Sequence, residues 1–286
     1  MKLKWQVCAI AALLIGCSSN RLKTEQAEKI NLAKPITIDL KIKPGSQFDT
    51  HYYSNSYVRT YSDQQLIREK HEAVDFTTVT AGLDYNPNLK LLRYKMRTVN
   101  KDGQVDLHEL AFPEKGEEIE FIVRGNARVV KAGPYPPDSL FFVPALPVPD
   151  HPVEVGDTWE MVHEWRSARE KIPLRLETIG VLKNIVKCEG DRICADIEIS
   201  GGVKLSISPD APGARFGSRI WGRMLFSLDK GDIIWSEVRS EEEMGTLSDR
   251  VLIQSCMQSE TKMYSDYKFK LNCEPGEIAV SGVPNL

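Results

Sequence analysis

The 286-residue sequence lacks long hydrophobic runs, low-complexity blocks and an excess of charge of either sign. Its 37 lysine and arginine residues are balanced by 40 aspartate and glutamate residues. No long basic stripe is present that could neutralise a phosphate backbone, which argues against a nucleic-acid partner. The one uninterrupted apolar stretch, near the N-terminus, is shorter than the ~20 residues that a membrane-spanning helix needs. The composition, 42% hydrophobic and 27% charged, is that of a folded globular protein.

Motifs of catalysis and metal binding are also missing. The histidines follow no metal-ligand spacing; they are His51, His71, His108, His151 and His163. Neither a Gly-x-Ser-x-Gly nor a Ser-x-x-Lys pattern occurs. The glycines at 213, 217 and 222 lack the lysine and serine or threonine of a phosphate loop and indicate a bend or bulge instead. The sequence therefore predicts a non-enzymatic protein without metal or cofactor. A hydrolase whose site assembles from distant strands is the alternative.

The first 17 residues have the pattern of an export signal. Lys2 and Lys4 form a basic start, residues 5–16 form a short apolar core, and Leu-Ile-Gly-Cys closes the segment at Cys17. This ending resembles the lipobox of bacterial lipoproteins, in which the cysteine is acylated and the preceding peptide is removed. The resemblance implies a signal peptide over residues 1–16 and a mature chain anchored to a membrane through lipid on Cys17. An ordinary secretory signal is the alternative.

The residues after Cys17 bear on location and on the link to the folded body. By resemblance to lipoproteins of bacteria with two membranes, Ser18 implies a place in the cell envelope at the outer membrane, facing the periplasm. Residues 17–35 are polar, contain few aliphatic side chains and end in Pro35. This composition predicts a flexible tether.

The remaining cysteines indicate disulfide bonds. Cys8 lies in the signal and Cys17 is the expected lipid site, which leaves Cys188, Cys194, Cys256 and Cys273, an even number in an exported chain. Alternating apolar runs on both sides of residues 189–192 predict a hairpin that brings Cys188 and Cys194 together. Pairing of Cys256 with Cys273 follows by elimination. A four-cysteine zinc site is the alternative, although the close Cys-x-x-Cys pairs of such sites are absent.

From residue 36 onward, apolar residues recur with period two. Residues 92–98, 118–123 and 195–200 alternate apolar with charged or polar side chains, which is typical of antiparallel strands with one dry and one wet face. Short turn sequences containing glycine, asparagine or aspartate separate these segments. We therefore predict an all-β fold of about twelve strands, a large antiparallel meander that forms either a half-open barrel or two packed sheets.

Seven prolines fall within residues 134–152 and divide this body. We expect an extended connector that lies across the body and buries Phe141, Phe142 and Leu146, with a ligand for a proline-reading partner as the alternative. The predicted organisation is thus a first β-rich half at 36–133, a second at 153–273 and a tail at 274–286. A glycine three residues before an aromatic residue opens both halves, so they form a possible repeat. The connector and the following Val-Gly-Asp-Thr-Trp also resemble uncharacterised β-rich envelope lipoproteins, which implies a fold and no activity.

Tyrosines are dense at residues 51–57 and at Tyr61. Cross-strand packing is the expected role, and a recognition surface is the alternative. Taken together, the sequence predicts a lipid-anchored, non-catalytic envelope protein that binds another envelope component or supports an assembly. The alternative is a carrier that holds an apolar ligand or acyl chain in a half-barrel.

Overall fold

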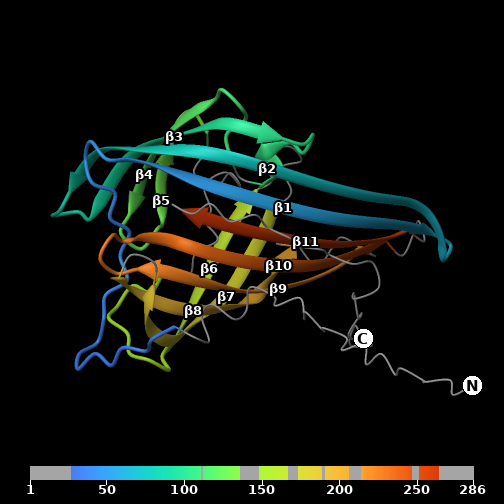
Figure 1. Cartoon of the computed structure of the whole chain (residues 1–286). Coiled ribbons are helices and arrows are strands. Elements are labelled where there is room, and N and C mark those ends of the chain that lie inside the picture. Colours follow the sequence, from blue (N-terminus) through green and yellow to red (C-terminus); the bar gives the residue numbers. More distant parts are fainter. Residues whose placement is uncertain are drawn as a thin grey trace, which may run out of the picture.

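The computed structural model describes residues 27–110, 112–135, 148–166, 173–188, 191–205, 214–246 and 251–263. Their eleven strands form one antiparallel sheet of order β5-β4-β3-β2-β1-β11-β10-β9-β8-β7-β6 (Figure 1). The first half contributes β1 (Gln47–Ser62), β2 (Gln65–Asn86), β3 (Leu91–Asp102), β4 (Glu118–Arg124) and β5 (Val129–Ala132). The second contributes β6 (Thr158–Arg166), β7 (Pro173–Cys188), β8 (Arg192–Leu205), β9 (Ala214–Ser227), β10 (Asp232–Thr246) and β11 (Val251–Met263). The all-β prediction is confirmed.

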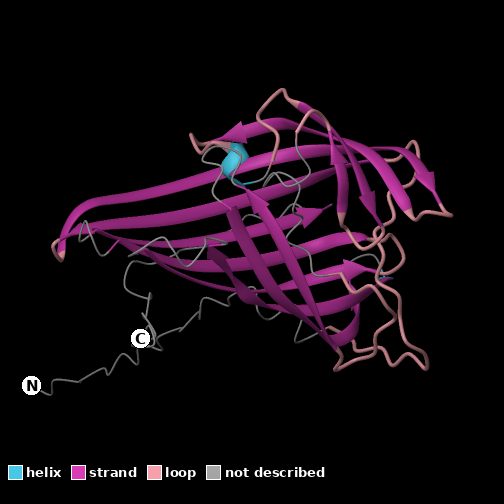
Figure 2. Cartoon of the chain, turned by 180° about the vertical axis from the view of Figure 1, so that it is seen from behind, coloured by secondary structure: helices cyan, strands magenta, loops and turns pink. Residues whose placement is uncertain are grey.

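Each half of the chain is a meander of hairpins, and the two meanders join at their ends. β11 returns to pair with β1 over thirteen residues, from Thr50 opposite Met263 to Ser62 opposite Val251. The short β5 and the nine-residue β6 are therefore the two edges of the sheet. The sheet curls strongly, so that β6 and β7 pass behind the long strands β1, β11 and β10 in Figure 1 and cross in front of them in the view from behind (Figure 2). A curled sheet of this kind encloses an inner face and exposes an outer one.

Period-two alternation separates these two faces as the sequence predicts. On β3 and β4 the inner side chains Leu92 and Ile119 are both 1% exposed, whereas outer Arg93 forms an ion pair with Glu120 at 2.7 Å. β8 buries Ala195, Ile197 and Ile199 on the inside. Its outer residue Asp196, expected to be wet, is fully buried, because Arg223 covers it with two 2.6 Å hydrogen bonds.

Two apolar clusters fill the inner face where the sheet curls. The larger one joins β6, β7, β8 and β9; it includes Trp159, Leu182, Ile197, Met224 and Phe226. The smaller one lies on β3 and β4 around Leu92 and Phe121. Trp159 lies flat over Gly180, where an added Cβ atom would come within 2.5 Å of the indole ring. Glycine at 180 is therefore needed to seat this tryptophan.

Residues 27–42, here called the strap, run across one end of the curled sheet. Their backbone N–H groups bond to four different parts of the body at 2.7–2.9 Å: Ile30 to Ile185, Ile36 to Val153, Leu40 to Gly125 and Lys41 to Gly231. Ile36 and Ile38 enter the larger apolar cluster. The sequence analysis placed residues 27–35 in a flexible tether, whereas the structure makes them part of the fold. Within residues 27–35, the partly buried Ile30 packs against the larger apolar cluster, and its N–H donates to the Ile185 carbonyl.

One of the two expected disulfides can be observed. Cys188 and Cys194 are bonded across the β7–β8 hairpin, with Cα atoms 5.9 Å apart, as predicted. Cys256 lies on β11 opposite Tyr57, while Cys273 and the expected lipid site Cys17 lie outside the described residues, as do the signal peptide, Phe141, Phe142, Leu146 and the tail. No helix in the described part of the chain is long and apolar enough to cross a membrane.

Candidate functional site

Five strands project beyond the rest of the sheet at the end opposite the strap. β3 pairs with β2 only from Asp75 to Asn86, and β8 pairs with β9 only from Gly201 back to Cys194. Past these limits, β2, β1, β11, β10 and β9 continue together as a ribbon (Figure 1). We define the ribbon as residues 56–62, 65–72, 214–219, 241–246 and 251–257. It is the part of the described molecule that extends farthest from the strap.

The β2 edge of this ribbon is open. Residues 65–72 pair with β1 on one side and have no strand on the other among the described residues. Leu66 and Ile67 at its tip are 48% and 61% exposed. The next residues alternate in charge, with Lys70 bonded to Glu72 at 2.6 Å. An exposed edge of this kind presents a row of backbone donors and acceptors that an added strand can pair with.

Aromatic and arginine side chains cover the outer face of the ribbon base. The Arg59 guanidinium lies 5.0 Å from the centre of the Tyr57 ring and donates to Tyr57 Oη at 2.8 Å. The same Arg59 forms an ion pair with Glu69 on β2. Beside them, His71 Nε2 is 2.6 Å from Asn55 Oδ1. Tyr57 is only 5% exposed, so its ring is packed within the base of the ribbon.

The same face continues across β10 and β9. Trp221 lies between two guanidinium groups, 5.1 Å from Arg219 and 5.3 Å from Arg239. Arg239 also pairs with Glu241 at 3.3 Å. Arginine, tyrosine and tryptophan are the residues most enriched at the energetic centres of protein interfaces. The outer face thus carries residue types that are enriched at such centres.

The tyrosine-dense segment is divided between the two faces. Tyr52 points inward and stacks on Phe76, with ring centres 4.9 Å apart, and burial raises the pKa of Tyr52 to about 12. This residue has the cross-strand packing role that the sequence analysis expected. Tyr57 instead belongs to the outer aromatic–arginine face described above. The alternation of β1 thus places Tyr52 and Tyr57 on opposite faces of the sheet.

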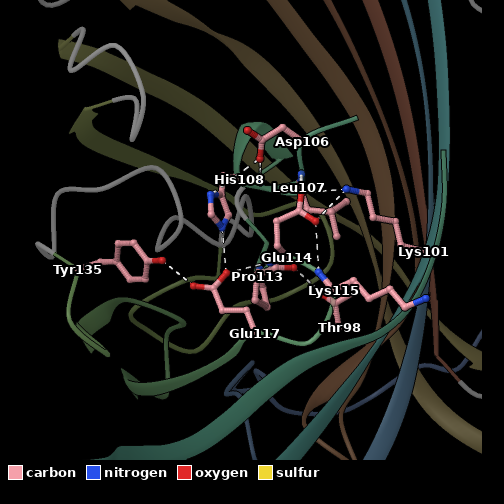
Figure 3. Close-up of polar contacts among 10 residues, drawn as sticks. All are labelled: Thr98, Lys101, Asp106, Leu107, His108, Pro113, Glu114, Lys115, Glu117 and Tyr135. Carbon is pink, nitrogen blue, oxygen red and sulfur yellow. Dashed lines mark hydrogen bonds and ion pairs between the residues drawn. The ribbon is translucent and has the colours of Figure 1, made fainter. Parts of the chain in front are cut away.

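A second group of polar residues lies in the connection between β3 and β4 (Figure 3). The 3₁₀ helix η1 (Leu107–Leu110) buries Leu107 against Val74 and Phe76, which folds this connection onto the inner face. Its polar side chains then meet around two carboxylates, Glu114 and Glu117. Glu114 accepts from Lys101 Nζ at 2.8 Å and from the backbone N–H of Leu107 at 2.7 Å.

Glu117 holds the other side of this cluster. It accepts from Tyr135 Oη at 2.6 Å and from the backbone N–H of Glu114 at 3.0 Å, and it lies 2.9 Å from His108 Nε2. The opposite ring nitrogen of His108 is 3.8 Å from Asp106 Oδ1. An imidazole between two carboxylates is a feature of many acid–base sites. The sequence analysis missed it, because residues 106, 108, 117 and 135 are not spaced as any known motif.

The pKa shifts of this cluster show how strongly its groups bind one another. Partial burial alone would raise the pKa of Glu114 and of Glu117, but the hydrogen bonds outweigh it and both pKa values are lowered. The hydrogen bond to Glu117 raises the pKa of Tyr135 to about 12. Thr98, also drawn in Figure 3, donates its hydroxyl to the carbonyl of Pro113 at 2.7 Å. The groups thus bind one another, and the arrangement fixes the β3–β4 connection to the end of β5.

The structure also places the other histidines and one of the glycines that the sequence analysis considered. His51 is hydrogen-bonded to Thr77, and His71 to Asn55. His151 is exposed, and His163 lies on β6. Across the residues that the structure describes, no group of three or more histidine, cysteine, aspartate or glutamate side chains could hold a metal ion. In β9, a Cβ atom on Gly222 would come within 2.3 Å of the Glu237 carbonyl, so close strand approach accounts for this glycine.

Comparisons with known proteins identify no family. No family model and no curated protein matches the chain. Among solved structures, DynF from the dynemicin biosynthesis pathway of Micromonospora chersina is 6% identical, with a TM-score of 0.22, over 86% of this chain and 92% of that one. An outer membrane channel from Pseudomonas putida F1 is also 6% identical, with a TM-score of 0.22, over 82% of this chain and 100% of that one. Scores this low carry no argument about function.

Proposed function

We propose that this protein is a lipid-anchored, non-catalytic binding module of the bacterial envelope, attached through Cys17 to the outer membrane and facing the periplasm. The observation that carries the binding role is the ribbon, five strands wide, which projects at the end of the sheet opposite the strap. The anchor and the binding element then lie at opposite ends of one rigid sheet. The lipid anchor itself rests on the resemblance of residues 1–17 to a lipobox signal.

The chemistry of the ribbon favours a protein partner. An extended segment of another protein could add to the β2 edge, gaining main-chain hydrogen bonds, while its side chains meet the exposed Leu66 and Ile67. Arg68, Glu69 and Lys70 discourage indiscriminate pairing, because an incoming strand must match their charges. The aromatic–arginine face beside this edge supplies further contact area.

Site-specific photocrosslinking in native envelopes tests this role. A photoreactive residue at Ile67 or Lys70 should give one discrete adduct, whereas the same residue at Ile179, a position on β7 that is also exposed, at 41%, should not. Mass spectrometry should then place the partner's crosslink in an extended segment. Adducts that are equal at all three positions, or absent from the ribbon, would refute the binding role of the ribbon.

The anchor has its own test. Wild-type protein should incorporate labelled palmitate and lose residues 1–16, and Cys17→Ala should remain an unprocessed precursor without label. Serine substitution at Cys8, which lies within the expected signal, provides the matched control and should leave labelling unchanged. Cleavage at any other position in the intact mass would remove the basis for the anchor.

One observation favours a second function, carriage of an apolar ligand with a polar head. Among the described residues, the hydroxyls of Thr178 on β7 and Ser218 on β9 are buried without a hydrogen-bond partner, and buried polar groups are nearly always paired. Both lie on the inner face, on either side of Gly201. Native mass spectrometry of protein purified from its own envelope distinguishes the two functions, because a carrier would retain a bound lipid and lose it in Thr178→Val.

A further inference from the structure

Three loop tips expose large apolar side chains at the strap end of the molecule. Leu32 in the strap is 43% exposed, Leu89 in the β2–β3 turn 63% and Val155 before β6 56%. Exposed apolar residues at adjacent loop tips are a feature of surfaces that meet another apolar phase. None of the three supports the fold by its burial.

The contacts of the strap bring these tips to one end of the body. Leu32 and Val155 line the same hollow of about 300 Å³, whose floor includes Ile185. Gly125 connects the β2–β3 turn to the strap by two backbone hydrogen bonds. Its N–H donates to the carbonyl of Lys90 in the turn, and its carbonyl accepts from the N–H of Leu40 in the strap. Leu32 and Val155 therefore share one hollow, and the turn that carries Leu89 is tied to the same strap through Gly125.

The charge of this surface is mixed. The strap carries three lysines against Glu28 and Asp39, Lys43 follows directly after it, and one arginine ends β4 while a second lies in the β4–β5 turn; the basic residues are Lys29, Lys34, Lys41, Lys43, Arg124 and Arg128. The loop before β6 contributes Asp150, Glu154 and Asp157. A nearly balanced surface gives no strong electrostatic attraction, so the apolar tips must provide most of any contact. Lysines around them suit the headgroup region, where long basic side chains keep their charge in water.

The covalent path from Cys17 limits where this end can lie. Ten residues, 17–26, separate the expected lipid from the first strap residue, and even fully extended they reach at most about 35 Å. The 22 residues of β2 correspond to roughly 70 Å of strand at ~3.3 Å per residue. The strap end therefore stays close to the bilayer, while the tip of the ribbon can stand well away from it.

We propose that the strap end is a membrane-contacting surface, in which Leu32, Leu89 and Val155 enter the interfacial region of the phospholipid bilayer. This proposal rests on the proposed lipid anchor at Cys17. Contact of the three tips with the bilayer would fix the body relative to the membrane plane, so that a flexibly attached protein takes a defined orientation. The ribbon then points into the periplasm, where a protein partner can reach it.

The test uses the full-length lipidated protein in vesicles of phosphatidylethanolamine and phosphatidylglycerol that contain a photoreactive phospholipid. After flotation and irradiation, peptides that contain the three tips should carry at least ten-fold more lipid adduct than the peptide that contains Leu66 and Ile67. The variant Leu32→Ser/Leu89→Ser/Val155→Ser should still float through its lipid but lose adducts at the tips by at least five-fold. The matched control Leu66→Ser/Ile67→Ser should label as the wild type does.

The outcomes separate this inference from the function on which it rests. Protein that fails to float shows that the anchor is absent and refutes both. Protein that floats but labels equally at the tips and at the ribbon, or labels unchanged in the triple variant, overturns the membrane-contacting surface and leaves the anchor intact. Because all three tips are exposed, the triple variant should unfold at the wild-type urea midpoint, which confirms that lost labelling is not lost folding.

Discussion

Asp232 shows how a single residue can lower the stability of this fold. It opens β10, is 6% exposed and has one carboxylate oxygen, Oδ1, buried with no hydrogen-bond partner in the described part of the chain. Burial raises its pKa to about 6, although the charges of Arg192 and Lys230 partly oppose the shift. Since the folded state holds the proton more tightly than an unfolded chain with a pKa of 3.8, stability falls as the pH rises through the range from about 4 to about 6.

Asp232→Asn should therefore stabilise the protein at pH 7.5 and have little effect at pH 4. A shift of about two pKa units sets an upper limit of roughly 3 kcal/mol on the gain. Urea unfolding at both pH values measures it. Asp191→Asn, at a position whose side chain is 87% exposed and forms an ion pair with Lys187, is the control and should change stability by less than about 0.5 kcal/mol. An equal effect of Asp232→Asn at both pH values would contradict the assigned cause.

At the scale of elements, the strap is the segment whose role differs most from the sequence-based expectation. Residues 27–35 have a polar, tether-like composition, and only residues 36–43 alternate clearly. The structure nevertheless bonds both parts to the body, because the open end of a curled sheet leaves backbone groups and apolar side chains that a crossing segment can satisfy. The strap thereby closes the end of the sheet next to the expected anchor.

Ile38→Ala tests whether the strap is part of the fold. Ile38 is fully buried in the larger apolar cluster, so its truncation should cost roughly 2–5 kcal/mol. Leu32→Ala in the same segment is the matched control and should be close to neutral, since Leu32 is exposed. Denaturant unfolding of the soluble chain from residue 18 onward provides the measurement. Equal unfolding midpoints for the two variants would show that the strap is a tether and not part of the fold.

The contribution of the β7–β8 hairpin to stability can be tested through its disulfide. Its disulfide links Cys188 and Cys194, six residues apart, and closing so short a loop is worth about 2 kcal/mol in the chain-entropy model. Cys188→Ser/Cys194→Ser should lower the free energy of unfolding by that amount, and dithiothreitol should reproduce the loss in the wild type only. In the oxidised protein neither cysteine should react with a thiol label. Labelling of Cys188 without reductant would contradict the bond.

For the whole molecule, the strand order makes the two halves of the chain interdependent. β1 lies between β2 and β11, and the strap bonds to both halves. Neither half can therefore complete its sheet or close its end alone. The protein should unfold as one cooperative unit.

Two spectroscopic signals can test this cooperativity without any substitution. Apart from Trp5 in the expected signal, the tryptophans all lie in the second half; they are Trp159, Trp165, Trp221 and Trp235. Tryptophan fluorescence thus reports the second half, while far-UV circular dichroism reports both. The two urea transitions should coincide within error. A fluorescence midpoint that differs from the circular dichroism midpoint would show that the halves unfold separately.

Local sequence was sufficient for the strands, the turns and the hairpin disulfide. The alternation of Leu92, Tyr94 and Met96 with charged residues predicts the dry face of β3 because side chains of a strand point to opposite sides with period two. The residues at 86–88 and 229–232 predict turns by their backbone preferences. These signals depend on neighbours a few residues apart, so they can be recognised in one sequence.

The tertiary structure alone decided which distant segments meet. The return of β11 to β1, the crossing of the strap, the pairing of Asp196 with Arg223 and the cluster of His108, Glu117 and Tyr135 all join residues whose separation follows no period. The ribbon also arises from unequal strand lengths across the sheet, which no single strand reveals. Such contacts are selected by the burial and hydrogen bonding of the whole sheet at once, and local patterns therefore cannot specify them.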